Sequence, residues 1–255
     1  MSFFDSIILG IVEGITEFLP ISSTGHLILA SKLLELPQSE FLKSFEIIIQ
    51  LGAILAVIVL YFRSFFDVEV LKKIAVAFLP TAVIGLTLYP VIKTYLLGNE
   101  TVVLAALFLG GIALIAFELL NKKEGAAGVS VSAISYRESL LIGLFQSIAV
   151  IPGVSRSAAT ILGGLMLGIN RVAIVEFSFL LAVPTMLAAT GLDIARSASL
   201  FSSEQFELLA VGFIVSFIVA LISIKFLLRF VQTNTFISFG IYRIVLALLF
   251  WFVIL

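Results

Sequence analysis

The sequence contains no cysteine, one histidine and few charged residues. Without cysteine the chain forms no disulfide, and a zinc site is not expected because such sites are built largely from cysteine and histidine. Charged residues are 12% of the 255 residues, whereas a soluble domain has about a quarter. The net charge of −1 says little about partners, and we expect no nucleic acid among them.

Apolar residues are correspondingly frequent. They are 61% of the chain, and the mean hydropathy is +1.25. One soluble globule cannot bury such an excess, because its surface still has to be covered by polar groups. The lipid bilayer is therefore the expected solvent. Residues 1–9 lack a basic segment and a small-residue cleavage site, so we expect no removable signal peptide.

The length of the apolar stretches predicts how the chain crosses the bilayer. A helix needs roughly 20 apolar residues to cross about 30 Å of hydrocarbon. Six stretches, separated by short polar loops, meet this requirement: 45–62, 74–95, 101–120, 172–195, 206–228 and 236–255. We therefore predict an all-α polytopic membrane protein with six spans.

Two further apolar stretches, 7–34 and 140–167, are interrupted by proline and by polar residues. Irregular backbone at membrane depth is tolerated only where protein or a water-filled cavity satisfies it. We predict that each stretch is a re-entrant hairpin of two helices, which returns to the side of the membrane it came from.

The two interrupted stretches resemble each other. Gly10-x-x-Glu13 matches Gly143-x-x-Gln146 at an offset of 133 residues, and Pro20 matches Pro152 at 132. Three predicted spans follow each hairpin, and an odd number of crossings forces the second half to be inverted. We predict one integral-membrane domain, 1–255, made of a first repeat, 1–120, a cytoplasmic linker, 121–137, and an inverted second repeat, 138–255, an architecture that builds sites near the midplane.

The loop charges predict the orientation. Four lysines and arginines lie on the side of the N-terminus and nine on the other side. The positive-inside rule then places the second side in the cytoplasm. Both termini are expected outside, with the first hairpin opening to the outer, periplasmic face of a bacterial inner membrane.

Glu13 and Glu17 stand four residues apart and share one face of a helix. Two such carboxylates in a membrane segment indicate a functional site, because they repel each other unless a cation, a shared proton or an arginine intervenes. A divalent cation held by one or two carboxylates suits phosphate chemistry. The alternative is a helix end whose side chains reach the interface.

A cluster of hydroxyl groups and the histidine follows Pro20: Ser22, Ser23, Thr24 and His26. One hydroxyl would suffice to cap the second half-helix, so the cluster as a whole indicates more than capping. A lone histidine is more often a satisfied polar residue than a catalyst. Its nearness to the serines and to Glu17 favours a catalytic role here.

Ser155, Arg156 and Ser157 open the second half-helix of the other hairpin. Free backbone N–H groups, hydroxyls and a guanidinium together make a site suited to phosphate. The alternative is a structural ion pair between Arg156 and Glu46 or Glu176. Those two glutamates and Arg243 are expected to pair with each other instead, without a catalytic role.

The residues also carry a family resemblance. EGITEFLPISSTGH, residues 13–26, resembles the first signature of the bacterial undecaprenyl-diphosphate phosphatases, the bacitracin-resistance proteins. PGVSRSAAT, residues 152–160, fits the second signature, P-G-x-S-R-S-x-x-T, and EFSFLLAVP, residues 176–184, resembles another stretch. The similarity runs over the whole chain.

The resemblance implies a metal-dependent membrane phosphatase that recycles the lipid carrier of cell-wall precursors. It implies two interlocking inverted repeats, a polyprenyl diphosphate substrate and a divalent cation, magnesium or calcium, at Glu13 and Glu17. The catalytic residues it implies are Glu17, Ser23, His26 and Arg156. The residues expected to bind substrate are Ser22, Thr24, Ser155, Ser157 and Thr160.

The expected mechanism begins with attack of Ser23 on the terminal phosphorus, with Glu17 as general base or metal ligand. His26 either assists the leaving group or is itself the nucleophile, and the sequence leaves both open. A lipid flippase or transporter is the alternative function, because inverted repeats are also transporter architecture. The sequence also leaves the oligomeric state open, a homodimer included.

Overall fold

A computed structural model describes residues 1–91, 95–96, 99–121, 130–197 and 202–254. These residues are helical and contain no strand. The α-helices are α1 (Phe3–Thr16), α2 (Ser23–Leu33), α3 (Glu40–Leu60), α4 (Val68–Val91), α5 (Glu100–Leu120), α6 (Tyr136–Gln146), α7 (Arg156–Met166), α8 (Arg171–Ser197), α9 (Ser203–Phe230) and α10 (Ile237–Ile254). Short 3₁₀ helices η1 (Phe62–Phe66), η3 (Val131–Ala133) and η4 (Ser147–Val150) join some of them.

Five helices, α3, α4, α5, α8 and α9, are long and apolar enough to cross a membrane. The apolar part of α10, Ile237–Phe252, is shorter. Each of the six predicted spans coincides with one of these six helices, although residues 92–94 and 255 of two spans lie outside the described part. The chain is therefore a polytopic, all-helical membrane protein, as predicted.

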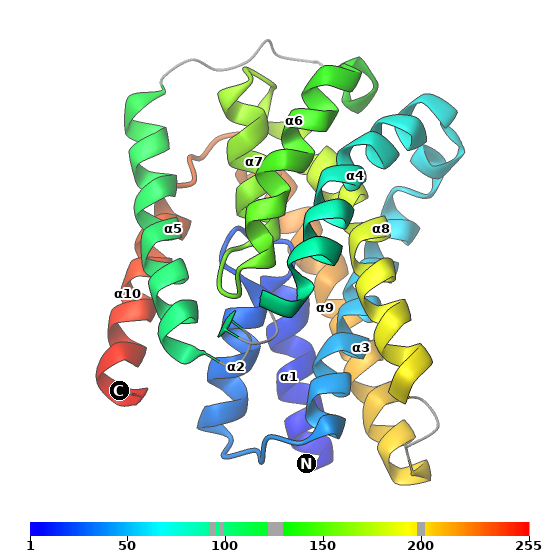
Figure 1. Cartoon of the computed structure of the whole chain (residues 1–255), viewed down its shortest axis with the longest axis vertical. Helices are drawn as coiled ribbons and strands as arrows, with labels where there is room; N and C mark the ends of the chain where they lie inside the picture. Colours follow the sequence, from blue (N-terminus) through cyan, green and yellow to red (C-terminus); the bar gives the residue numbers. More distant parts are fainter. Residues whose placement is uncertain (92–94, 97–98, 122–129, 198–201, 255) are drawn as a thin grey trace.

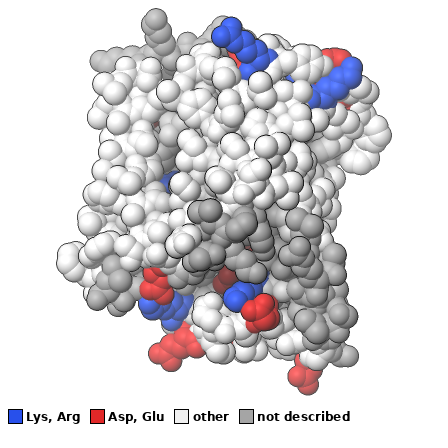
Figure 2. Space-filling view, in the orientation of Figure 1, with Lys and Arg blue, Asp and Glu red and all other residues white. Residues whose placement is uncertain are grey.

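The surface agrees with this assignment. On the face drawn in Figure 2, acidic and basic side chains gather at the two ends of the molecule, and a broad, almost uncharged band lies between them. Exposed ion pairs such as Lys32–Glu100 and Lys72–Glu69 belong to these ends. The band is the part of the surface that lipid would cover.

Both interrupted stretches form helix hairpins. α1 and α2 occupy the lower half of the molecule, α6 and α7 the upper half, and the two turns meet near mid-height (Figure 1). α1 ends just before Glu17, and α2 begins at Ser23, so the break contains Pro20. The second break contains Pro152 and Gly153, whose φ of +89° favours glycine.

Close helix contacts hold each hairpin against a long helix of the other half of the chain. α1 packs on α9, and α6 packs on α4. Gly10 of α1 permits this approach, because a Cβ there would lie 2.8 Å from the carbonyl oxygen of Gly212. Gly143 of α6 faces the backbone of Ala77 in the same way. Small residues at such contacts are typical of membrane helices.

Candidate active site

The break between α1 and α2 brings a carboxylate and a hydroxyl together. Glu17 follows the last turn of α1, and Ser23 is the first residue of α2. The chain reverses between them, so the Ser23 hydroxyl donates a hydrogen bond of 2.5 Å to Glu17 Oε2. Both side chains are buried. A hydroxyl bonded to a buried carboxylate is the arrangement expected of a nucleophile and its general base.

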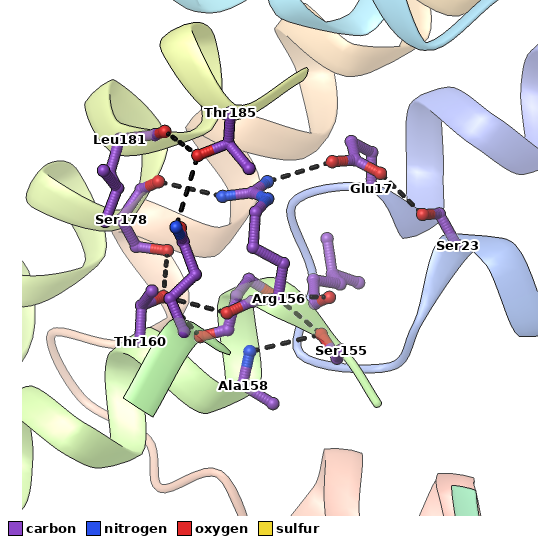
Figure 3. A network of polar contacts seen from close by, with 12 residues as sticks. Glu17, Ser23, Ser155, Arg156, Ala158, Thr160, Ser178, Leu181 and Thr185 are labelled. Carbon is purple, nitrogen blue, oxygen red and sulfur yellow. Dashed lines mark hydrogen bonds and ion pairs between the residues drawn. The ribbon is translucent and has the colours of Figure 1, made fainter. Parts of the chain in front are cut away.

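Arg156, the first residue of α7, reaches the same carboxylate from the other hairpin. Its Nη2 donates to Glu17 Oε1 at 3.0 Å, and its Nη1 donates to the carbonyl oxygen of Ser178 on α8 at 2.9 Å. The guanidinium therefore lies between Glu17 and α8 (Figure 3). Its Nε is buried and has no hydrogen-bond partner. This buried N–H is therefore unsatisfied in the structure.

Hydroxyl groups around Arg156 hold the two breaks together. The Ser157 hydroxyl donates to the carbonyl oxygen of Leu19 in the first hairpin at 2.9 Å. The Thr160 hydroxyl lies 2.6 Å from that of Ser178, and Ser155 caps α7 by accepting from Ala158 N. Ser157 and Thr160 are fully buried. These contacts hold the start of α7, from which Arg156 reaches Glu17 (Figure 3).

Glu13 lies one turn before Glu17 on α1 and is fully buried. Neither of its carboxylate oxygens has a hydrogen-bond partner. Its charge interacts with those of Glu17, Glu46 and Arg156. A buried carboxylate without a partner is costly. Glu13 is therefore the side chain in this region that most needs a cation or a proton.

The other residues of the cluster after Pro20, which are Ser22, Thr24 and His26, have different surroundings from Ser23. Ser22 has a φ of +73° and caps α2 by accepting from Gly25 N at 3.4 Å. His26 lies 2.7 Å from the Ser22 carbonyl oxygen through Nδ1 and 2.7 Å from the Tyr242 hydroxyl through Nε2. Thr24 is exposed. His26 thus contacts α10, whereas Ser23 contacts Glu17.

One expectation about buried charges is wrong. Arg243 does not pair with Glu46 or Glu176: its guanidinium donates to the backbone carbonyl oxygens of Pro20, Ala106, Leu107 and Gly153. Glu46 accepts a hydrogen bond from Ser31 at 2.7 Å. Carbonyl oxygens of the two helix breaks, Pro20 and Gly153, and of α5 satisfy the arginine, and a sequence pattern does not reveal such partners.

Two residues that contact the site were not singled out from the sequence. Ser178 lies within the stretch 176–184, which carries part of the resemblance, but its carbonyl and hydroxyl had no assigned role. Tyr242 lies 216 residues from His26 along the chain. No local sequence pattern predicts a contact between residues so far apart in the chain.

The geometry allows a defined chemistry. A serine hydroxyl, a buried carboxylate and an arginine with a free N–H converge where two helix breaks meet. This set can activate a hydroxyl and hold an anion beside it, as phosphoryl transfer to a serine requires.

Residues 6–249 match the family described as bacitracin resistance protein BacA. The chain belongs to this family. The matched segment contains both helix breaks and Tyr242 and Arg243 of α10.

Curated relatives cover almost all of the chain. A protein of Sulfurihydrogenibium sp. named undecaprenyl-diphosphatase is 51% identical over 98% of this chain and 99% of its own length. One of Aquifex aeolicus with the same name is also 51% identical, over 98% of each chain. One of Campylobacter jejuni is 49% identical over 97% of this chain and 92% of its own. The resemblance expected from the two signatures is confirmed.

Proposed function

We infer that the protein is a membrane phosphatase that hydrolyses undecaprenyl diphosphate to undecaprenyl phosphate and inorganic phosphate. This activity recycles the lipid carrier of cell-wall precursors. The family and the name shared by its relatives support this function and not the flippase alternative. The observation that carries the inference is the Ser23 hydroxyl bonded to Glu17, with Arg156 on the other oxygen.

The reaction follows from these three side chains. Ser23 Oγ attacks the terminal phosphorus, and its proton passes to Glu17 Oε2. The bond from that phosphorus to the bridging oxygen breaks, and undecaprenyl phosphate leaves. Water then attacks the phosphoserine, inorganic phosphate is released and Ser23 regains its proton. Arg156 stabilises the phosphate oxygens by a charge-assisted contact whose strength grows in a buried site, and the unsatisfied Nε in the structure supports this role.

The geometry does not favour His26 as the nucleophile. Both ring nitrogens already lie at hydrogen-bond distance from other groups, the Ser22 carbonyl and the Tyr242 hydroxyl. Ser23, by contrast, already lies against its base. Of the two nucleophiles left open by the sequence, the geometry therefore favours Ser23.

Glu13 and Glu17 are the residues that would hold a divalent cation, magnesium or calcium. Glu13 fits this role because both of its buried oxygens lack a partner. Among the described residues no three acidic, histidine or cysteine side chains come together. Phosphate oxygens and water would complete the coordination, as is usual for magnesium. The bound ion would neutralise charge on the phosphate.

The remaining residues predicted to bind substrate fall into two groups. Thr24 is exposed at the first turn of α2, where its hydroxyl would bind the substrate. Ser22, Ser155, Ser157 and Thr160 shape the two helix starts, whose N–H groups favour an anion.

The helix contacts support two inverted repeats, 1–120 and 138–255, joined by a linker at 121–137. The two repeats match α1 with α6, α2 with α7, and so on to α5 with α10. Under this exchange the α1–α9 contact becomes the α6–α4 contact. The α3–α8 and α5–α10 contacts are unchanged by the exchange. We propose that each hairpin is re-entrant. The charge asymmetry of the loops supports an orientation in which the open end of the first hairpin and both termini lie on the outer face of the inner membrane.

A phosphate-release assay on purified protein in detergent tests the function. With a polyprenyl diphosphate as substrate, wild type should release phosphate, and Ser23→Ala should be at least about a thousandfold slower because the nucleophile is lost. Detergent removes any gradient, so a pure transporter would release none. Absence of phosphate release by wild type, with and without added magnesium or calcium, would refute the assignment.

A further inference from the structure

Tyr242 on α10 makes a specific contact with the only histidine in the chain. Its hydroxyl lies 2.7 Å from His26 Nε2. The two rings are parallel within 4°, with centroids 5.5 Å apart. His26 is buried, while 43% of Tyr242 is exposed. The tyrosine therefore covers the imidazole on the side of α10.

The contact of the other ring nitrogen of His26, Nδ1, determines whether the Tyr242 hydroxyl donates or accepts its hydrogen bond. Nδ1 lies 2.7 Å from the Ser22 carbonyl oxygen, which only accepts hydrogen bonds, so Nδ1 carries a proton. In the neutral imidazole Nε2 then holds the lone pair and accepts from the Tyr242 hydroxyl. Together the two contacts select one tautomer and one ring orientation.

The same turn of α2 carries the proposed nucleophile. Ser22, whose carbonyl holds His26, directly precedes Ser23, whose hydroxyl donates to Glu17. The left-handed φ of Ser22, +73°, is strained for a residue with a side chain and persists only where its surroundings hold it. A ring fixed by Tyr242 is part of those surroundings.

We propose that Tyr242 is a positioning residue of the reaction, which acts through His26 by fixing its tautomer and orientation. This inference rests on the proposed phosphatase function. Tyr242 shares no hydrogen bond with Glu17, Ser23 or Arg156 in the described structure. A tyrosine that merely packs against α2 would act through its ring alone, and Tyr242→Phe keeps that ring.

Nuclear magnetic resonance of the imidazole nitrogens reads the contact directly. Protein labelled with ¹⁵N-histidine and carrying no histidine tag gives signals from His26 alone. Wild type should show a protonated Nδ1 and an unprotonated, hydrogen-bonded Nε2. Tyr242→Phe should shift the Nε2 resonance and mix the tautomers. Tyr136→Phe removes a hydroxyl bonded to Glu69 on the surface and should change neither signal.

Kinetics tests whether the contact matters for turnover. Tyr242→Phe should lower kcat between about twofold and tenfold, the range for one net hydrogen bond, with little change in KM. Combined with His26→Ala it should cost no more than His26→Ala alone, because Tyr242 then has nothing to position.

Three results would overturn the proposal: unchanged His26 resonances in Tyr242→Phe, an unchanged kcat, or additive losses in the double variant. Failure of the phosphatase assignment is distinguishable from these. In that case wild type releases no phosphate, and the role of Tyr242 in catalysis falls with it, although the resonances still report the contact between the two rings.

Discussion

The planar guanidinium of Arg156 makes two hydrogen bonds. It bonds Glu17 and the Ser178 carbonyl at the same time, which requires two N–H groups at a fixed angle. A third N–H, at Nε, stays free. Lysine carries its charge on a single nitrogen at the end of a flexible chain and cannot reproduce this fork.

We therefore expect Arg156→Ala to fold in the membrane but to lose at least about a hundredfold in kcat/KM, and Arg156→Lys to recover little of it. Phosphate release measured beside a folding control, such as gel filtration in detergent, checks this. Nearly full activity of Arg156→Lys would reduce the arginine to a countercharge for Glu17.

Glu13 and Glu17 differ in their surroundings although they share one helix face. Glu17 has partners on both oxygens, and Glu13 has none. Glu17→Gln should abolish turnover, because it removes the base for Ser23 and the anion that pairs with Arg156. Glu13→Gln should retain turnover but need a higher metal concentration for half-maximal rate.

A metal titration of phosphate release in both variants measures this difference. Wild-type activity should vanish with chelator and return with magnesium or calcium. Full wild-type activity in chelator, with both glutamine variants inactive, would assign the two carboxylates to proton transfer and remove the metal from the mechanism.

At the scale of elements, the hairpins depend on backbone contacts. Arg243, 1% exposed, binds carbonyl oxygens of both breaks, those of Pro20 and Gly153, and of α5. One guanidinium thereby sets the distance between the two turns that carry Ser23 and Arg156. Glycines allow the close approach of α1 to α9 and of α6 to α4.

Gly10→Ala tests the packing of the first hairpin. Its Cβ would lie 2.8 Å from the Gly212 carbonyl oxygen, so α1 and α9 have to move apart. We expect a loss of about 1 to 3 kcal/mol and a lower melting temperature by circular dichroism in detergent. Gly85→Ala on α4 meets no atom within 4 Å and should be neutral or slightly stabilising. Equal melting of the two variants would contradict the close contact.

At the scale of the whole molecule, the charged ends and the uncharged band predict its position in the bilayer (Figure 2). Gln38, between α2 and α3, and Gln232, between α9 and α10, are both exposed and lie at opposite ends of the chain's long helices. Both can be replaced by cysteine in a chain that contains none. Gly98 and Gly125, equally suitable by sequence, lie outside the described residues.

In intact cells Gln38→Cys should react with a membrane-impermeant thiol reagent, because the first hairpin opens outward. Gln232→Cys should react only after the cells are opened. Mass-shift labelling of the two variants measures this. The reverse order of labelling would place the first hairpin in the cytoplasm and overturn the orientation drawn from the loop charges.

The sequence by itself determined the membrane class, the stretches that form long apolar helices and the places where helices break. These features are local: an apolar run of sufficient length has to be a helix in lipid, and Pro20 and Pro152 cannot continue one. The signatures around the two prolines also brought Glu17, Ser23 and Arg156 into one hypothesis, and the structure joins these side chains by hydrogen bonds.

Only the tertiary structure decided which partner each buried polar group finds. Arg243 meets four carbonyls, His26 meets Tyr242, and Arg156 meets Ser178, across separations of 22 to 223 residues. A buried arginine or histidine requires some partner, but a carboxylate, a hydroxyl and a backbone carbonyl can each satisfy it. Which of them lies within hydrogen-bond distance follows from how the two hairpins pack against α5, α8 and α10, and no local stretch of sequence specifies that packing.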